Sequence, residues 1–282
     1  MKSLFIVPAL FAALLVPSFV QAQTPAPISK AIGALESDSY RTKVTSSFKM
    51  GFLGATLTTD TKADAYTDAA GNAEGKVKMK MSFSSENSKK SGDSFSMPMQ
   101  YKYFAEDDSF YLKFDKLPKG ESPIKGVKAK TWYKGTITDS EMLTRATNQA
   151  YLTSEHFLEA QAKHPAIKFV EVGSTKKEYR YAYSVDQSRI ASFLMEQARL
   201  SGATMTQIEA GQAASFLGAV SGTLSVDKKT LQPTKQTQRV GASDGLNVQT
   251  TATYSFKDSK KITRPKKAVA DPEVIEALFP GT

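Results

Sequence analysis

Long segments of this chain alternate polar and apolar residues with a period of two. Along 43–50 the apolar or small residues Val44, Ser46, Phe48 and Met50 alternate with Lys43, Thr45, Ser47 and Lys49. Successive side chains of a strand point to opposite faces, so this spacing predicts a strand with one buried and one solvated face. Strand patterns also run over 56–66, 77–83, 101–104, 109–114, 132–137, 179–185, 222–226, 233–240 and 248–256. Polar turns separate several of them, so we expect a meander of antiparallel strands.

Helical spacing appears at the start of the chain and in its middle. The predicted helices cover 28–35, 139–151, 154–163, 186–200 and 204–217. Asp139 or Ser140 can cap the second of these, and Asp186 is a candidate N-cap for the fourth. Strands with a block of inserted helices predict an α+β fold. We find no internal linker or repeat, which favours one domain over 23–282.

The first 22 residues have the pattern of an export signal. Lys2 is followed by an apolar run from Leu4 to Val20, and Val20-Gln21-Ala22 resembles a signal peptidase site. The mature chain would begin near Gln23 with a short proline-bearing leader. We therefore predict a secreted or periplasmic protein of the extracytoplasmic cell envelope, soluble after cleavage; an uncleaved anchor is the alternative.

Cysteine is absent and the chain is basic, with a formal net charge of +9. Burial alone must stabilise the fold, because neither a disulfide nor an acylated cysteine is available. The charge favours anionic glycans, phospholipid headgroups or teichoic-type polymers, and export argues against nucleic acid. The densest cluster is in the C-terminal tail, where we expect a solvated surface: Lys257, Lys260, Lys261, Arg264, Lys266 and Lys267.

No set of residues predicts catalysis. Residues 241–245 match the nucleophile-elbow pattern G-x-S-x-G, but they lie between two strand patterns and no histidine follows them, so a hairpin turn is expected. The only two histidines, His156 and His164, are eight residues apart, which does not fit a metal pair one helical turn apart; we expect solvated helix residues. We predict a non-enzymatic protein without a cofactor.

Two further patterns resemble metal sites, but neither predicts one. Met79 and Met81, like Met97 and Met99, have the spacing that soft Cu(I) ligands can use, but core methionines in strands have the same spacing. The acidic run 106–108 lacks the spaced ligands and the glycine of a calcium loop, so we expect a charged hairpin tip.

Three segments carry a resemblance to a known family. The first, 220–233, is a strand with an acidic turn that resumes at Leu231-Gln232-Pro233. The second, 178–186, is a tyrosine-rich strand that leads into helices, and the third, 254–265, ends with Ile262-Thr263-Arg264-Pro265. With the layout of strands and inserted helices, the resemblance covers most of residues 28–268 and is to the lipoprotein-carrier superfamily, which contains the LolA and LolB carriers and the LppX and LprG type lipoproteins. It implies a curved antiparallel sheet, or half-open barrel, with the helical block packed over its concave face. It also implies an apolar cavity for acyl chains. Many LppX relatives carry an acylated cysteine that this chain lacks.

Two functions therefore remain open. In the first, the protein shelters a lipid, acyl chain or similar hydrophobic ligand between sheet and helices, because burying each methylene contributes about 0.8 kcal/mol. The candidate lining residues, chosen by strand face and aromatic character, are Val44, Phe48, Met50, Met79, Met81, Phe83, Tyr101, Tyr103 and Trp132. In the second, the sheet has a solid core and the lysine-rich face binds an anionic envelope polymer, a membrane surface or a protein partner.

Overall fold

The computed structural model describes 25–52, 55–85, 94–107, 109–117, 127–136, 154–200, 202, 204–217, 220–241, 247–257 and 260–270. These residues belong to two compact units. Unit 1 is drawn from Ser39–Asn148 and Ser255–Thr282, and unit 2 from Val16–Asp38 and Gln149–Tyr254. Each unit contains its own run of adjacent strands and is described separately. The predicted single domain over 23–282 stays a prediction.

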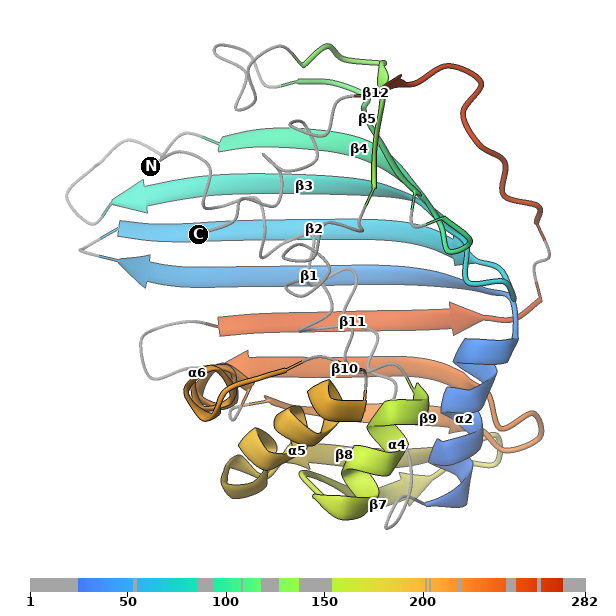
Figure 1. Ribbon diagram of the computed structural model, residues 1–282, viewed down its shortest axis with the longest axis vertical. Helices are drawn as coiled ribbons and strands as arrows, with labels where there is room; N and C mark the ends of the chain where they lie inside the picture. The colour runs from blue at the N-terminus through green and yellow to red at the C-terminus, as the bar shows by residue number, and fades with distance from the viewer. Residues whose placement is uncertain are drawn as a thin grey trace. The chain divides into compact units, whose positions relative to one another are not determined.

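Unit 1 consists of long antiparallel strands joined in sequence order. They are β1 (Tyr40–Phe52), β2 (Ala55–Thr67), β3 (Ala73–Ser85), β4 (Ser94–Phe104), β5 (Ser109–Phe114) and β6 (Trp132–Thr136), with the short β12 (Val269–Ala270) parallel to β6. The strand order is β12-β6-β5-β4-β3-β2-β1 (Figure 1). Each long strand pairs with the next along most of its length. The predicted meander is confirmed.

The two faces of unit 1 differ in chemistry, as the alternation predicts. One face, called the methionine face below, carries Val44, Phe48, Leu57, Ala63, Val77, Met79, Met81, Met97, Met99, Leu112 and Phe114, all at most 8% exposed. The opposite face carries lysines at the alternating positions of β1 and β3. The sequence therefore specified both faces correctly.

The turn between β2 and β3 shows why the strands end where they do. Asp68 Oδ1 accepts hydrogen bonds from the backbone N–H groups of Ala70 (3.0 Å) and Asn72 (2.9 Å). Gly71 has φ of +79°, a conformation that glycine adopts without strain. The side chain of Asp68 thus replaces backbone partners that the strands leave unpaired.

The end of unit 1 crosses the lysine-bearing side of its own sheet. In this closing segment, residues 260–270, the backbone N–H of Lys260 donates to the Tyr66 hydroxyl (2.7 Å). Ile262 is buried in a cluster with Tyr66, Phe104 and Tyr111, and Trp132 packs against the same cluster. A segment that is far from these strands in sequence is therefore held by both hydrogen bonds and apolar burial.

Unit 2 combines four helices with five antiparallel strands among the described residues. The helices are α2 (Ala26–Ser37), α4 (Ser154–Lys163), α5 (Gln187–Leu200) and α6 (Gln207–Leu217). The strands are β7 (Ile167–Ser174), β8 (Glu178–Val185), β9 (Val220–Asp227), β10 (Pro233–Gly241) and β11 (Asn247–Ser255), in the order β11-β10-β9-β8-β7. Figure 1 shows the helices grouped together, and α2 contacts β9 and β10.

Two helices of unit 2, α5 and α6, begin at side chains that cap them. The backbone N–H of Ser188 donates to Asp186 Oδ1 (3.0 Å), which confirms the predicted cap of α5. At α6, Thr206 and Glu209 form a capping box, with the Glu209 N–H donating to Thr206 Oγ1 (3.3 Å) and the Thr206 N–H to Glu209 Oε2 (2.8 Å). On α5 the apolar residues Ile190, Phe193, Leu194 and Ala198 are buried, because their spacing places them on one stripe.

Most predicted elements are confirmed, and two differ. The predicted strand at 101–104 is part of the longer β4, and β7 had no counterpart among the predictions. Pro98 interrupts the usual strand pattern of β4, and most of β7 is exposed, including Val170 and Val172, so neither segment shows a clean two-residue period. The predicted helix over 139–151 and the turn at 243–245 lie outside the described residues. None of the helices within those residues is long and apolar enough to cross a membrane.

Candidate functional site

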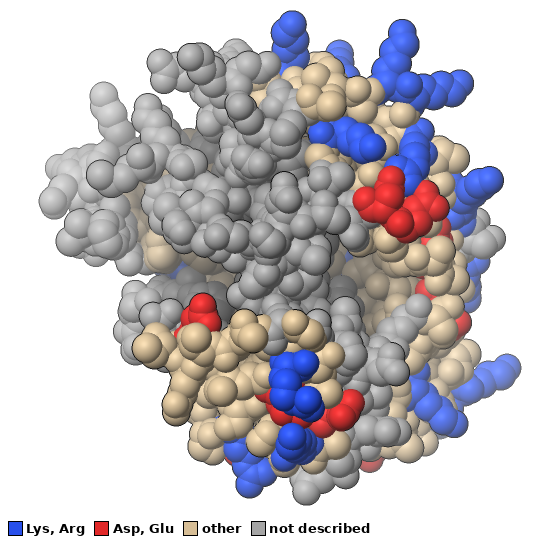
Figure 2. Space-filling view, viewed as in Figure 1, with Lys and Arg blue, Asp and Glu red and all other residues tan. Residues whose placement is uncertain are grey.

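Cationic side chains dominate one face of unit 1, which we call the basic face. It carries Arg41, Lys43 and Lys49 on β1, Lys62 on β2, Lys76, Lys78 and Lys80 on β3, and Lys102 on β4. All except Lys102 are exposed, and the side chains between them are mostly Ser and Thr. Only three acidic residues share this face of β1–β4 among the described residues, namely Asp60, Asp64 and Glu74. The surface is therefore strongly positive. Figure 2 shows Lys and Arg side chains projecting from the rim of unit 1.

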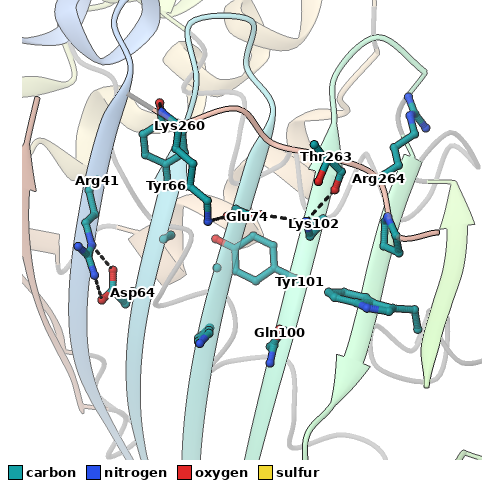
Figure 3. Close-up of a pocket in the computed structure, with 15 residues that line it drawn as sticks. Arg41, Asp64, Tyr66, Glu74, Gln100, Tyr101, Lys102, Lys260, Thr263 and Arg264 are labelled. Carbon is teal, nitrogen blue, oxygen red and sulfur yellow. Dashed lines mark hydrogen bonds and ion pairs between the residues drawn. The ribbon is translucent and has the colours of Figure 1, made fainter. Parts of the chain in front are cut away.

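A pocket of about 920 Å³ lies at the end of the basic face that the closing segment crosses (Figure 3). Its lining side chains include five cations, Arg41, Lys76, Lys102, Lys260 and Arg264, and two carboxylates, Asp64 and Glu74. Gln100, Trp132, Thr263 and Pro265 also line it. The pocket thus combines an excess of positive charge with an amide and an indole ring.

Glu74 is shared by two ammonium groups. Lys102 Nζ lies 2.9 Å from one carboxylate oxygen, and Lys260 Nζ forms an ion pair with the other (Figure 3). Burial would raise the pKa of Glu74, but the hydrogen bonds from Lys260 and Lys102 outweigh it, so this pKa lies below its usual value. Lys102 and Glu74 are largely shielded from water, with 18% and 15% of their side chains exposed. One carboxylate cannot neutralise two ammonium groups, which leaves a surplus of positive charge in the pocket, and the 63% exposed side chain of Lys260 carries part of it to solvent.

Arg41 and Asp64 form the second ion pair of the pocket. The guanidinium Nε and Nη2 of Arg41 each donate to one carboxylate oxygen of Asp64 at 2.7 Å. These hydrogen bonds lower the pKa of Asp64. Lys76 is the register partner of Asp64 on β3. Asp64 therefore faces Arg41 on one adjacent strand and Lys76 on the other.

Arg264 fixes the closing segment to the β4–β5 hairpin. Its guanidinium donates to both carboxylate oxygens of Asp107 (2.9 and 3.0 Å), forms an ion pair with Glu106 and lies 4.4 Å above the Phe104 ring. The hydrogen bonds from Arg264 lower the pKa of Asp107 to about 2. The prediction that the basic tail forms a solvated surface is confirmed for its lysines, which are all exposed, although Lys260 also pairs with Glu74. It was wrong for Arg264, which is half-buried because it binds carboxylates on the sheet.

This arrangement is suited to binding a polyvalent anion. Lysines in rows with Ser and Thr between them offer charge and hydrogen-bond donors along a surface, and the indole of Trp132 offers a flat apolar wall. In the described part of the chain, no group of three or more His, Cys, Asp or Glu side chains is placed to hold a metal ion.

The structure separates the predicted lining residues into two places. Val44, Phe48, Met79 and Met81 are buried together on the methionine face, with Met50 and the 40% exposed Phe83 at one end of it. Tyr101 and Tyr103 follow the same alternation on β4 and are half-buried, and Tyr101 is also among the residues that line the pocket (Figure 3). Trp132 pairs with Lys113 on the opposite face and lines the pocket. Whether the buried set contacts a ligand stays a prediction.

The methionine face also contains polar atoms without partners. Within the described structure, the hydroxyls of Thr42, Thr59 and Thr61 are buried and make no hydrogen bond. Thr59 pairs in register with Met81, and Thr61 with Met79. An unsatisfied buried hydroxyl costs about 1–3 kcal/mol, so a bound molecule with a hydrogen-bonding group would be stabilised here.

Sequence reasoning missed the ion pairs that define the pocket. The signal was incomplete: the 68–72 turn fixes the register of β2 and β3 and so places Asp64 opposite Lys76, but the ion-pair partner of Asp64 is Arg41 on β1. The Glu74–Lys102 pair depends on the register of β3 and β4, which that turn does not set. The partners supplied by the closing segment, Lys260 and Arg264, follow no local pattern. They could be located only from the tertiary structure.

Comparisons with known proteins do not assign a family. No family model matches the chain, and no curated protein matches it. Among solved structures, it is similar to a beta-barrel-like protein of the domain of unknown function DUF1849 from Brucella abortus, with 8% identity and a TM-score of 0.32, covering 78% of this chain and 98% of that one. It is also similar to a DUF1329 family protein from Desulfovibrio piger, with 11% identity and a TM-score of 0.21, covering 82% of this chain and 90% of that one. Both scores are too low to support an argument about this chain.

Proposed function

We propose that the chain is an exported, non-enzymatic binding protein that takes an anionic carbohydrate polymer of the cell envelope on its basic face. The observation that carries this proposal is the surplus of positive charge at Glu74, where Lys102 and Lys260 share one carboxylate, at one end of a face covered with exposed lysines. The ligand would lie along the rows of β1–β3, and one of its charged sugar residues would enter the pocket.

The chemistry of the pocket favours a charged sugar over a simple ion. A carboxylate or phosphate would be bound by Lys76, Lys102 and Lys260, while a sugar ring can pack on the indole of Trp132. Exposed lysines attract polyanions through long-range charge, which salt screens within about 10 Å at 0.1 M ionic strength. We therefore expect retention on polygalacturonate to fall steeply as salt rises.

Replacing Glu74 with Gln should strengthen binding of an anionic oligosaccharide. The substitution removes the carboxylate that competes with the ligand for Lys102 and Lys260, so affinity for trigalacturonate should rise about two- to tenfold, the range expected for one partly shielded charge pair. Isothermal titration calorimetry at low salt measures this change.

Asp60→Asn is the matched control, because Asp60 is an exposed carboxylate on the same face but does not line the pocket. It should change the affinity by much less than Glu74→Gln. Equal gains from both variants would show that only the net charge of the face matters and would contradict the pocket as the specific site. No binding to either wild type or variant would contradict the proposal as a whole.

A second candidate function is the sheltering of an acyl chain, which the resemblance to lipoprotein carriers implies. The methionine face favours it, since flexible thioethers adapt to ligands of irregular shape and the partnerless hydroxyls of Thr59 and Thr61 could receive an ester or hydroxyl group. In that proposal the helical block covers the concave side of the sheet.

Native mass spectrometry of the protein purified from its own envelope tests this second function. A retained lipid that is lost in a Met79→Gln variant, but kept in a Lys78→Gln variant of the neighbouring exposed position, would support it. A lipid-free protein that also fails to displace a fluorescent fatty acid would contradict it.

A further inference from the structure

A second pocket, in unit 2, gathers soft metal ligands. It has a volume of about 460 Å³ and is lined by His164, Ser192, Met195, Glu196, Arg199, Thr204 and Met205. His164 follows the last residue of α4, Met195 lies on α5, and Met205 precedes α6. Three separate stretches of the chain, the end of α4, α5 itself and the segment before α6, therefore bring one imidazole and two thioethers to a single pocket.

These three side chains are accessible and uncommitted. Met195 is 38% exposed, although most large apolar residues of α5 are buried, and His164 and Met205 are half-buried. Among the residues that the structure describes, none of the three side chains makes a hydrogen bond or an ion pair. Their donor atoms are free to bind an ion that enters from solvent.

The one carboxylate that lines the pocket among the described residues is already bound. Glu196 accepts hydrogen bonds from Arg199 Nη2 (2.7 Å) and Nε (3.1 Å) and from Lys163 Nζ (3.0 Å). Hard divalent ions such as Ca²⁺ and Mg²⁺ prefer oxygen ligands and would have to displace both cations, so the pocket does not suit them.

We propose that His164, Met195 and Met205 form a binding site for a soft monovalent cation, Cu(I) or Ag(I). Thioethers select soft ions, and imidazole suits copper. The neighbouring Arg199 and Lys163 disfavour a divalent ion more than a monovalent one, because electrostatic repulsion scales with charge. The site is independent of the basic face and goes beyond the polymer-binding proposal. It also reassigns His164, for which the sequence predicted only a solvated helix residue.

Titration with Ag(I) alone, followed by NMR of protein labelled with ¹³C in its methionine methyl groups, tests the site. The expected result is saturation at one Ag(I) per chain, with shifts of the Met195 and Met205 methyl signals and of the His164 ring protons. Met195→Leu, Met205→Leu and His164→Gln should each weaken Ag(I) binding about tenfold or more, since each removes one of three donors. Competition for Cu(I) between the protein and a colorimetric chelator under anaerobic conditions should show the same loss of affinity in the three variants.

Met81→Leu is the control, because Met81 lies in the methionine face of unit 1 and is buried. This variant should bind Ag(I) as the wild type does. The proposal is overturned if Ag(I) shifts no methionine methyl, if it shifts those of Met79 and Met97 instead, or if the three variants keep wild-type affinity. Leucine preserves the volume of these exposed or half-buried side chains, and circular dichroism would show whether the fold is kept.

Discussion

Replacing Gly222 with Ala is expected to destabilise the protein by about 3 kcal/mol, at the upper end of the usual cost of overpacking. A Cβ at this position of β9 would lie 2.1 Å from the backbone oxygen of Thr237 and 2.5 Å from the Tyr183 hydroxyl. Neither neighbour can easily move. Thr237 is held in the β9–β10 ladder, and the Tyr183 hydroxyl donates to Thr237 O (3.2 Å) and accepts a hydrogen bond from Gln236 Nε2 (3.1 Å).

Chemical denaturation of Gly222→Ala and Gly33→Ala measures the effect against a matched control. Gly33 lies in α2 of the same unit, and nothing lies within 4 Å of the Cβ that alanine would add there. Gly33→Ala should therefore be neutral or stabilise the fold by about 0.5–1 kcal/mol. Equal unfolding midpoints for the two variants would contradict the packing of Tyr183 over Gly222.

Replacing Ile262 with Ala is expected to cost about 2–4 kcal/mol and to weaken ligand binding at the pocket. Ile262 is 7% exposed in the cluster with Tyr66, Phe104 and Tyr111, and the truncation leaves a cavity there. The same segment supplies Lys260, Thr263 and Arg264 to the pocket. Loosening it should therefore lower trigalacturonate affinity as well as stability.

Hydrogen exchange distinguishes local release from global unfolding in this variant. The amide of Lys260, which donates to the Tyr66 hydroxyl, should exchange faster in Ile262→Ala, while amides of β2 and β3 keep most of their protection. Val269→Ala is the control, since Val269 lies on the same segment but is 49% exposed. A Lys260 amide as well protected as in the wild type would show that Ile262 does not anchor the segment.

The sequence predicted the strands best where one face is buried and the other wet. Over 43–50 and 77–83 the alternation fixed which side chains are buried, and Met79 and Met81 are buried as it predicts. The alternation failed to predict strands in which neither face is clearly buried. In β7, Val170 and Val172 are exposed, so the apolar residues of this strand do not mark a buried face. Pro98 interrupts the strand pattern in β4, so the sequence did not predict the first half of that strand.

The candidate site was less predictable than the fold. Trp132 was grouped with the methionine set, although it lies on the opposite face and contributes to the polar pocket. Sequence alone could not assign this face, because the strand β6 has only five residues and its pairing with β5 decides the alternation.

By itself, the sequence determined the period of the strands, the cap of α5 and the polarity of the two faces of unit 1, because each depends on residues close together along the chain. Only the tertiary structure decided which charges meet. Lys260 binds Glu74 across 186 positions, and the soft ligands of unit 2 come from three elements. Contacts of this kind depend on register and on the path of the closing segment, and no local pattern encodes either.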